Sequence, residues 1–244
     1  MNTLLFKPEE RLEDGRVRID DRRFEHVRDV LKKAVGDTLE VGEIGGWLGS
    51  ALIDSLDESS MTLCPKLDSP PPVALDTHVY LALPRPKMLR RSLRALAEFG
   101  VKRITLIHSY HVDKSYWQTP FLRDAAIDAT LRAGLEQSCD TLMPVVAFER
   151  RFRPFVEDRL PGLLERRSAL LADPSASRPF PVQMTLPAAL IIGPARGFTR
   201  FESDLIEQAG AQPVSLGART LRVENALTAT LGSALISSLN QPDS

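Results

Sequence analysis

The C-terminal third of the chain decides the fold. Residues 189–226 read ALIIGPARGFTRFESDLIEQAGAQPVSLGARTLRVENA. An apolar strand over residues 189–192 runs into a glycine-rich turn. Thr199, followed three residues later by Glu202, then forms a capping box that predicts a helix over residues 200–209. A strand, a turn and a capped helix in this order predict part of an α/β domain.

The same alternation of strands and helices continues on both sides of this stretch. Gly100 and Gly210 each follow a predicted helix, where glycine accommodates the left-handed end of the helix. The predicted strands are residues 78–83, 103–108, 145–148, 169–172 and 212–216, and the predicted helices are residues 86–99, 122–138 and 221–239. Because the strands are almost continuously apolar, they are typical of a parallel sheet with helices on both faces.

The N-terminal part has a different pattern of apolar and polar residues. Short runs of alternating apolar and polar residues predict strands over residues 38–41, 47–53 and 61–63, and one helix is predicted over residues 24–33. This pattern favours a small β-barrel or sandwich. The proline-rich stretch 64–77 separates this pattern from the alternating strands and helices that follow it. We therefore expect two domains, residues 1–70 and residues 74–244.

The composition excludes several classes of protein. The 31 Lys and Arg residues nearly balance the 32 Asp and Glu residues, which excludes a globally basic nucleic-acid binder. The two cysteines, Cys64 and Cys139, have no further Cys or His at metal-ligand spacing, so no metal is expected. The sequence contains no signal peptide and no apolar run long enough to span a membrane. A cytoplasmic protein is the resulting expectation.

Two loops are candidates for chemistry, because ligands of such sheets bind where strands lead into helices. They are residues 192–198 and residues 215–226. Neither contains the dinucleotide fingerprint or the P-loop, which argues against NAD and ATP. Taken singly, the first loop is explained by an ordinary glycine turn, and Arg222 with Glu224 is explained by a surface ion pair. Two glycine-bearing loops after successive strands favour a binding site.

At these loops the chain resembles the RsmE-type methyltransferases of the SPOUT superfamily. The pattern of that family runs GPEGG, an acidic residue opening a helix, AG, a strand ending in SLG, and ILRTETA. The matching residues here are Gly193, Pro194, Gly197, Glu202, Gly210, Ser215, Leu216, Gly217, Leu221, Arg222, Glu224 and Ala226. Residues 81–107, the KSYW segment 114–117 and residues 135–146 resemble further family segments, and residues 26–46 are similar to its N-terminal barrel.

The resemblance implies a PUA-like RNA-binding β-barrel over residues 1–70 and a SPOUT α/β domain with a C-terminal trefoil knot over residues 74–244. It implies methylation of N3 of a uridine in 16S ribosomal RNA, with S-adenosylmethionine (SAM) as cofactor, 16S rRNA or the small ribosomal subunit as partner, and a homodimer. The implied cofactor-binding residues are Ala172, Gly193, Pro194, Gly197, Leu216, Gly217 and Leu221. Arg222 is expected to orient the base and stabilise charge on its carbonyl oxygen, and Glu224 to hold Arg222 or assist proton removal.

Positive charge on one predicted helix suggests where RNA binds. Lys87, Arg91 and Arg94 follow at i, i+4 and i+7 and form one stripe, which suits phosphates; a solvated helix face is the alternative. Lys114 is a further candidate, near Trp117, for which ordinary packing is the default interpretation.

Two other functions stay open. The family's GPEGG is GPARG here, with Ala195 in place of an acid and Arg196 in place of a glycine. The chain is then either a non-catalytic RNA-binding relative with a degenerate cofactor loop, or a methyltransferase that acts on another RNA.

Overall fold

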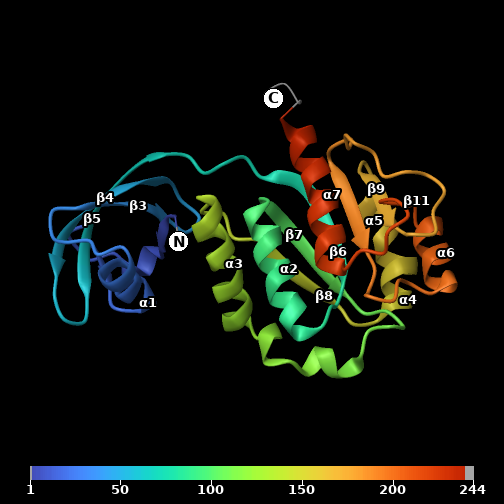
Figure 1. The fold of residues 1–244 in the computed structure, drawn as a ribbon, viewed down its shortest axis with the longest axis horizontal. Helices are drawn as coiled ribbons and strands as arrows, with labels where there is room; N and C mark the ends of the chain where they lie inside the picture. Colours follow the sequence, from blue (N-terminus) through green and yellow to red (C-terminus); the bar gives the residue numbers. More distant parts are fainter. Residues whose placement is uncertain (1, 240–244) are drawn as a thin grey trace. The chain divides into compact units, whose positions relative to one another are not determined.

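The computed structural model describes residues 2–239, which divide into two compact units (Figure 1). The described residues 2–73 and 132–143 make the first unit, and residues 74–131 and 144–239 make the second. The sequence-based division placed residues 132–143 with the second domain, whereas the structure packs them with the first unit. Residues 1 and 240–244 of the predicted domains lie outside the described residues.

The first unit contains a curled five-stranded mixed sheet with strand order β1-β3-β4-β5-β2. β1 and β3 are parallel, and the other neighbours are antiparallel. Its elements are β1 (Leu4–Phe6), η1 (Pro8–Glu10), β2 (Val17–Ile19), α1 (Arg22–Glu25), η2 (His26–Val30), β3 (Thr38–Glu43), β4 (Leu48–Leu56) and β5 (Met61–Ser69). The three strands predicted here are present. The sequence pattern did not predict β1 and β2, because each has only three residues.

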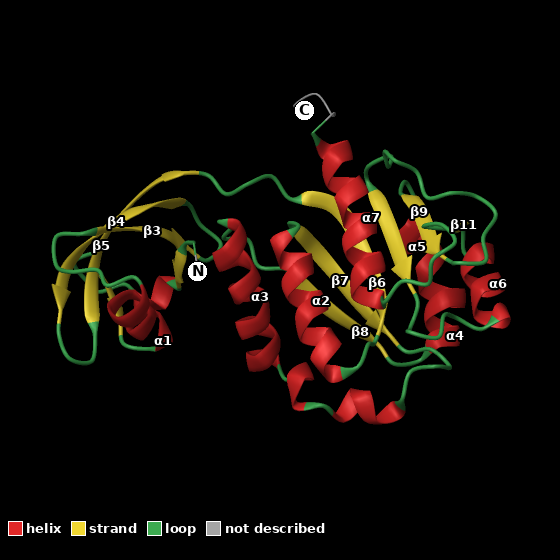
Figure 2. Ribbon diagram, in the orientation of Figure 1, coloured by secondary structure: helices red, strands yellow, loops and turns green. Residues whose placement is uncertain are grey.

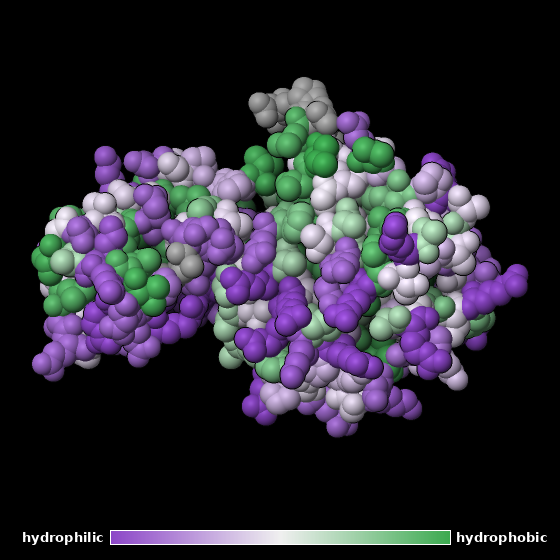
Figure 3. Space-filling model, viewed as in Figure 1, coloured by the Kyte–Doolittle hydropathy of each residue, from purple (hydrophilic) through white to green (hydrophobic). Residues whose placement is uncertain are grey.

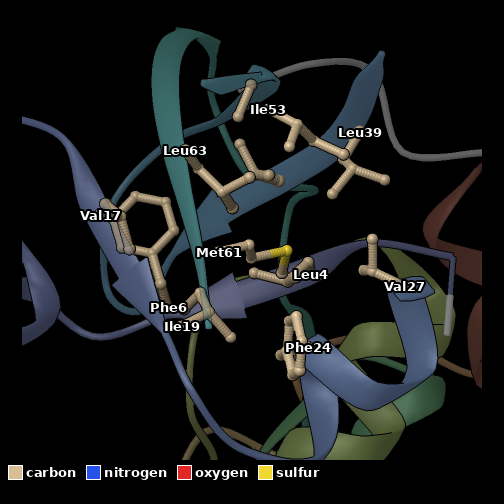
Figure 4. Close-up of a cluster of buried hydrophobic side chains, with 12 residues drawn as sticks. Leu4, Phe6, Val17, Ile19, Phe24, Val27, Leu39, Ile53, Met61 and Leu63 are labelled. Atoms are coloured by element: carbon tan, nitrogen blue, oxygen red, sulfur yellow. The ribbon is translucent and has the colours of Figure 1, made fainter. Parts of the chain in front are cut away.

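The inner side of this sheet carries the core of the first unit (Figure 4). Alternate residues of the strands point inward, and Phe24 and Val27 from α1 and η2 close the cluster. Both of these side chains are at most 2% exposed. The predicted helix over residues 24–33 is shorter in the structure, because η2 ends at Val30 and Lys32 adopts a left-handed φ of 51°.

Residues 132–143 are held to the first unit by hydrogen bonds. The carbonyl oxygen of Glu136 accepts from the backbone N–H groups of Asn2 and Thr3, both at 3.0 Å. The buried carboxylate of Glu136 pairs with Arg22 at 3.0 Å, and the carbonyl oxygen of Thr141 accepts from Gly45 N. These contacts join positions more than 90 residues apart, which local sequence patterns cannot predict.

The linker between the units is shorter than the proline-rich stretch suggested. β5 continues to Ser69, so only residues 70–74 separate it from β6 (Leu75–Ala82). Pro65 lies inside β5, opposite Ala51 of β4. A strand tolerates proline where its other edge is free. β2 pairs with β5 only from Met61 to Leu63, so the edge of β5 away from β4 has no strand partner at Pro65.

The second unit is built on a six-stranded sheet with strand order β11-β9-β10-β6-β7-β8, in which all neighbours are parallel (Figure 2). Its remaining strands are β7 (Val101–Ile107), β8 (Val145–Glu149), β9 (Ser168–Ala172), β10 (Ala188–Ile192) and β11 (Gln212–Val214). β10 is buried at all five positions, so both faces of the sheet are covered. The prediction of an α/β fold with a parallel sheet is confirmed.

The helices of the second unit follow the predicted order, with two helical additions at residues 114–122 and 152–164. They are α2 (Pro86–Glu98), η3 (Lys114–Gln118), η4 (Pro120–Leu122), α3 (Asp124–Ser138), α4 (Phe152–Pro154), η5 (Phe155–Arg159), α5 (Leu160–Leu164), α6 (Arg200–Gln208) and α7 (Val223–Ser238). Residues 132–138 of α3 belong to the first unit. The helical segment from Phe152 to Leu164 was missed, because Pro154 and Pro161 break its apolar periodicity. Across residues 2–239, no helix is long and apolar enough to cross a membrane.

Candidate functional site

Three neighbouring strands of the second unit end level with one another. In the register of the sheet, Ile192 at the end of β10 pairs with Ala172 at the end of β9, and Val214 at the end of β11 pairs with the same Ala172. The loops that follow these strands therefore start side by side. Such a meeting of loops at the carboxyl ends of parallel strands is where α/β proteins bind ligands.

A cavity of about 370 Å³ lies among these loops. This volume falls within the range of small-molecule sites, roughly 300–1,000 Å³. All seven residues predicted to bind a cofactor line it: Ala172, Gly193, Pro194, Gly197, Leu216, Gly217 and Leu221. Apolar side chains of Ile192 and Val214 contribute to the wall, and Arg196 and Arg219 line the cavity without filling it.

The glycines of the cavity serve different purposes. A Cβ on Gly193 would lie only 3.1 Å from Cδ2 of the Phe198 ring, so this position needs glycine for space. Gly197 and Gly217 have φ values of +73° and +109°, which other residues rarely adopt, and a Cβ on either would meet no atom within 4 Å. Backbone groups on these loops are therefore open to a ligand.

The two residues predicted to be catalytic stand at the edge of the cavity. Arg222 is the N-cap residue of α7, between Leu221 and Val223, which both line the cavity. Glu224 lies in the first turn of α7. The Arg222 side chain is exposed, and within residues 2–239 neither side chain makes a hydrogen bond or ion pair. The alternative of an Arg222–Glu224 surface ion pair is therefore wrong, and Arg222 is not held by Glu224.

The predicted RNA-binding residues lie on the surface of the second unit. Lys87, Arg91 and Arg94 are exposed on α2, whereas Leu89 and Leu93 on its opposite side are buried. Hydrophilic side chains cover this face of α2 in Figure 3. Arg94 pairs with Glu98 at 3.0 Å, which offsets part of the charge. Lys114, the first residue of η3, is exposed as well.

Several residues near the site were not recognised as part of it in the sequence. His111 Nδ1 contacts the carbonyl oxygen of Gly197 at 2.9 Å, and the buried carboxylate of Glu202 accepts from Tyr110 N at 2.7 Å. Capping geometry predicted the role of Glu202 at α6, but no sequence signal pointed to its contact with the loop after β7. His108 and His111 each contact another part of the second unit.

Trp117 packs as expected. It is 9% exposed, and its Nε1–H donates to His108 Nδ1 at 3.0 Å. Burial lowers the pKa of His108, and the positive charge of Lys114 lowers it further against the opposing effect of Glu202. The ring is therefore neutral and able to accept from the indole. Among the described residues, no group of three or more His, Cys, Asp or Glu is placed to hold a metal ion.

Comparison with known proteins identifies the family. The model of the RNA methyltransferase domain family matches residues 71–235. Ribosomal RNA small subunit methyltransferase E of Treponema pallidum (strain Nichols) is 30% identical over 240 residues, which cover 94% of this chain and 88% of that protein. This chain belongs to the methyltransferase E family. The methyltransferase E of Synechocystis sp. is 28% identical and covers 93% of this chain and 75% of its own length.

Solved structures share the fold of this methyltransferase E chain. A methyltransferase of Legionella pneumophila, in complex with SAM, aligns with a TM-score of 0.76 at 21% identity and covers 96% of this chain and 97% of that chain. The methyltransferase E of Neisseria gonorrhoeae, bound to S-adenosyl methionine, aligns with a TM-score of 0.72 at 18% identity. The alignment covers 97% of this chain and 98% of that chain. The predicted resemblance to RsmE-type enzymes is confirmed, and with it the prediction that the chain is an RNA methyltransferase.

Proposed function

We propose that this chain transfers a methyl group from SAM to N3 of a uridine in 16S ribosomal RNA. The observation that carries the proposal is the cavity at the level ends of β9, β10 and β11, lined by all seven predicted cofactor residues. Family membership supports the reaction and the RNA substrate. Relatives named for the small ribosomal subunit, and two solved neighbours that hold SAM, support the finer assignment.

The cavity suits SAM in size and in chemistry. An adenosine moiety needs apolar contacts for its ring faces and backbone groups for its polar edge. Ile192, Val214 and Leu216 offer the apolar wall, and the turns at Gly197 and Gly217 offer open backbone. Arg196 lines the cavity but leaves about 370 Å³ free, which supports an intact cofactor site over a degenerate one.

The residues of the chain then have separate tasks in the reaction. SAM supplies a methyl group on a sulfonium, so the protein must align the uracil with it and help remove the N3 proton. Arg222, exposed beside the cavity and unpaired among residues 2–239, is placed to orient the base and to stabilise charge that develops on a carbonyl oxygen. Glu224 is the candidate for assisting proton removal, acting independently of Arg222.

The finer fold assignments belong to the same proposal. The curled sheet and its core of twelve buried residues support a PUA-like RNA-binding barrel in the first unit. The segment between β9 and β10 supports a C-terminal knot, because it bonds both to Ser215 and to α7. Phe180 N donates to Ser215 O at 2.8 Å, and Ser233 Oγ donates to Pro181 O at 2.9 Å.

The C-terminal half of α7 supports a homodimer. Leu235 and Ile236 there, Leu239 directly after the helix and Val182 in the adjoining segment are all at least 42% exposed. Apolar side chains gather over this end of α7 in Figure 3. Such a surface is typical of an interface, and sedimentation of the full chain tests it. We also propose the cytoplasm, where ribosomal subunits are made, as the location.

Nucleoside mass spectrometry tests the proposed reaction. The full-length protein is incubated with SAM carrying a deuterated methyl group and with either 16S rRNA or small ribosomal subunits. Deuterated N3-methyluridine is the expected product, and transfer RNA serves as the control substrate. Label in another nucleoside or only in transfer RNA would indicate a different RNA target. An absence of SAM binding by calorimetry would favour the non-catalytic RNA-binding alternative.

A further inference from the structure

The loop after β7 makes a hydrogen bond to the glycine turn of the cavity. His111 Nδ1 lies 2.9 Å from the carbonyl oxygen of Gly197. A carbonyl oxygen can only accept, so Nδ1 carries the proton and donates. The two residues are 86 positions apart, and both belong to the second unit. The bond is therefore a tertiary contact that fixes the end of the turn.

A second contact holds the same loop in place. Tyr110 N donates to Glu202 Oε1 at 2.7 Å. Glu202 is 5% exposed, and its Oε2 accepts from both Thr199 N at 2.9 Å and Thr199 Oγ at 3.0 Å. Three donors from two segments thus satisfy one buried carboxylate, which anchors residues 110–111 to the start of α6. The backbone beside His111 is therefore held in place, which fixes the position of His111 relative to Gly197.

The hydrogen bond from His111 sets the orientation of a single peptide group. A trans peptide is planar, so its C=O and N–H point in opposite directions. When the Gly197 carbonyl points to His111, the N–H of Phe198 points the other way. A Cβ on Gly193, across the turn, would lie 3.3 Å from Phe198 N, so this N–H lies beside another wall of the cavity. Within residues 2–239 it donates to no acceptor.

Glycine makes that orientation easy to lose. Gly197 has a φ of +73°, and a glycine rotates between backbone conformations at little cost. Its N–H donates to Pro194 O at 2.8 Å, which closes the turn but leaves the following peptide free to rotate. The bond from His111 is the contact that selects one of the two orientations.

We propose that His111 is a positioning residue, which holds the Gly197–Phe198 peptide so that the Phe198 N–H is presented to the cofactor. The proposal rests on the proposed function, because it takes SAM as the ligand of the cavity. His111 does not touch the reacting atoms. It acts through the peptide.

Three substitutions at one position test this role. His111→Ala removes the donor. His111→Asn retains it, because the amide nitrogen of Asn is placed like Nδ1, whereas His111→Gln places its amide nitrogen like Nε2. His26→Ala, in the first unit, is the matched control. Each full-length variant is measured by calorimetry with SAM, by hydrogen exchange of residues 193–199 without SAM, and by steady-state kinetics.

We expect His111→Ala and His111→Gln to weaken SAM binding about tenfold, as loss of one good hydrogen bond implies. The KM for SAM should rise with little change in kcat, and exchange at residues 193–199 should accelerate. His111→Asn should restore both affinity and protection, a rescue that general loss of packing would not give. His26→Ala should behave as the unmodified protein does.

The outcomes separate the two proposals. If His111→Ala leaves SAM affinity and exchange unchanged, the positioning role is overturned and the proposed function stands. If His111→Asn and His111→Gln are equally impaired, the ring acts by packing and the positioning role is again overturned. If the unmodified protein does not bind SAM, both proposals are overturned, whatever the exchange data show about the turn.

Discussion

Arg222 owes its position to the start of a helix. As the N-cap residue of α7 it has extended backbone angles, with φ −68° and ψ 155°, while its neighbours Leu221 and Val223 form part of the cavity wall. Its side chain is exposed and makes no hydrogen bond or ion pair with any other residue in the range 2–239. A free guanidinium next to a binding cavity is available to a substrate without the loss of an internal ion pair.

Replacing Arg222 by Ala should therefore reduce methyl transfer without unfolding the protein. We expect kcat to fall about 100-fold or more, which is the usual cost of removing a group that stabilises developing charge. SAM affinity and the thermal unfolding midpoint should not change. Arg200→Ala is the matched control, because Arg200 also starts a helix but is 96% exposed. Full turnover by the Arg222 variant would remove Arg222 from the catalytic site.

Gly197 is required for its backbone conformation. A φ of +73° is strained for a branched residue, whereas Asn tolerates it comparatively well. We expect Gly197→Val to abolish SAM binding by calorimetry and Gly197→Asn to retain part of it. Gly232→Ala in α7 is the control; it should leave binding intact, since a Cβ there meets nothing within 4 Å. Equal affinity of the Val and Asn variants would show that the conformation of the turn does not matter.

At the scale of the element, α2 has one buried apolar face and one exposed charged face. Leu89, Leu93 and Leu96 are buried. The exposed side carries Lys87 and Arg91, and neither forms an ion pair within residues 2–239. Arg94 is paired with Glu98. Lys87 and Arg91 are thus the cations of α2 best able to bind phosphate.

The double substitution Lys87→Glu and Arg91→Glu should weaken RNA binding while leaving SAM affinity unchanged. The slope of log affinity against log salt concentration is negative, and each lost phosphate contact reduces its magnitude by about 0.7–0.9. For two lost contacts we expect the magnitude of the slope to fall by roughly 1.4–1.8. Filter binding at several salt concentrations measures this slope. The neutral pair Lys87→Gln and Arg91→Gln controls for added repulsion. A slope equal to that of the unmodified protein would assign this face of α2 to solvent alone.

The elements that sequence reasoning predicted best are those with local signals. The capping box at Thr199 and the glycine after α2 are contained in a few adjacent residues, and both helices begin and end close to the expected positions. The cavity was predictable for the same reason, since its glycine-bearing loops directly follow apolar strands. The helical segment from Phe152 to Leu164 was not, because prolines interrupt its periodicity.

Long-range contacts account for most of what the sequence could not reveal. The contacts of residues 132–143 with the first unit, and the bond from His111 to Gly197, join distant segments through single polar groups. No periodicity encodes such a contact. Whether Arg222 pairs with Glu224 also depends on where their side chains lie in space, so the sequence left the ion pair as one of two alternatives.

At the scale of the whole molecule, one half-buried histidine, His78, makes the free energy of unfolding depend on pH. Burial, together with the positive charges of Arg167 and Arg103, lowers the pKa of His78 to about 4. Its ring stacks on Tyr80 with centroids 4.1 Å apart, and Nε2 lies 2.9 Å from Thr105 Oγ. In the unfolded chain the same ring titrates near 6.5.

The sign of the effect follows from these two values. Between pH 6.5 and pH 4 the unfolded chain takes up a proton at His78 that the folded protein does not, so folding stability falls as the pH falls. We expect His78→Gln to be less stable at neutral pH, through the lost stacking, but to show a flatter dependence over this range. Urea unfolding at pH 7 and pH 4.5 measures it. An undiminished slope would place the responsible group elsewhere.

Because the cavity lies at the level ends of β9, β10 and β11, it also determines at what point of its synthesis the protein can first bind a ligand. The cavity takes its walls from residues 172–175, 192–198 and 214–226, so no part of the nascent chain emerging before the last of these can hold a ligand. A premature stop codon shortly after residue 214 would leave the whole parallel sheet encoded, yet would remove the final wall. Translation of this gene therefore yields a binding protein only once the start of α7 has left the ribosome.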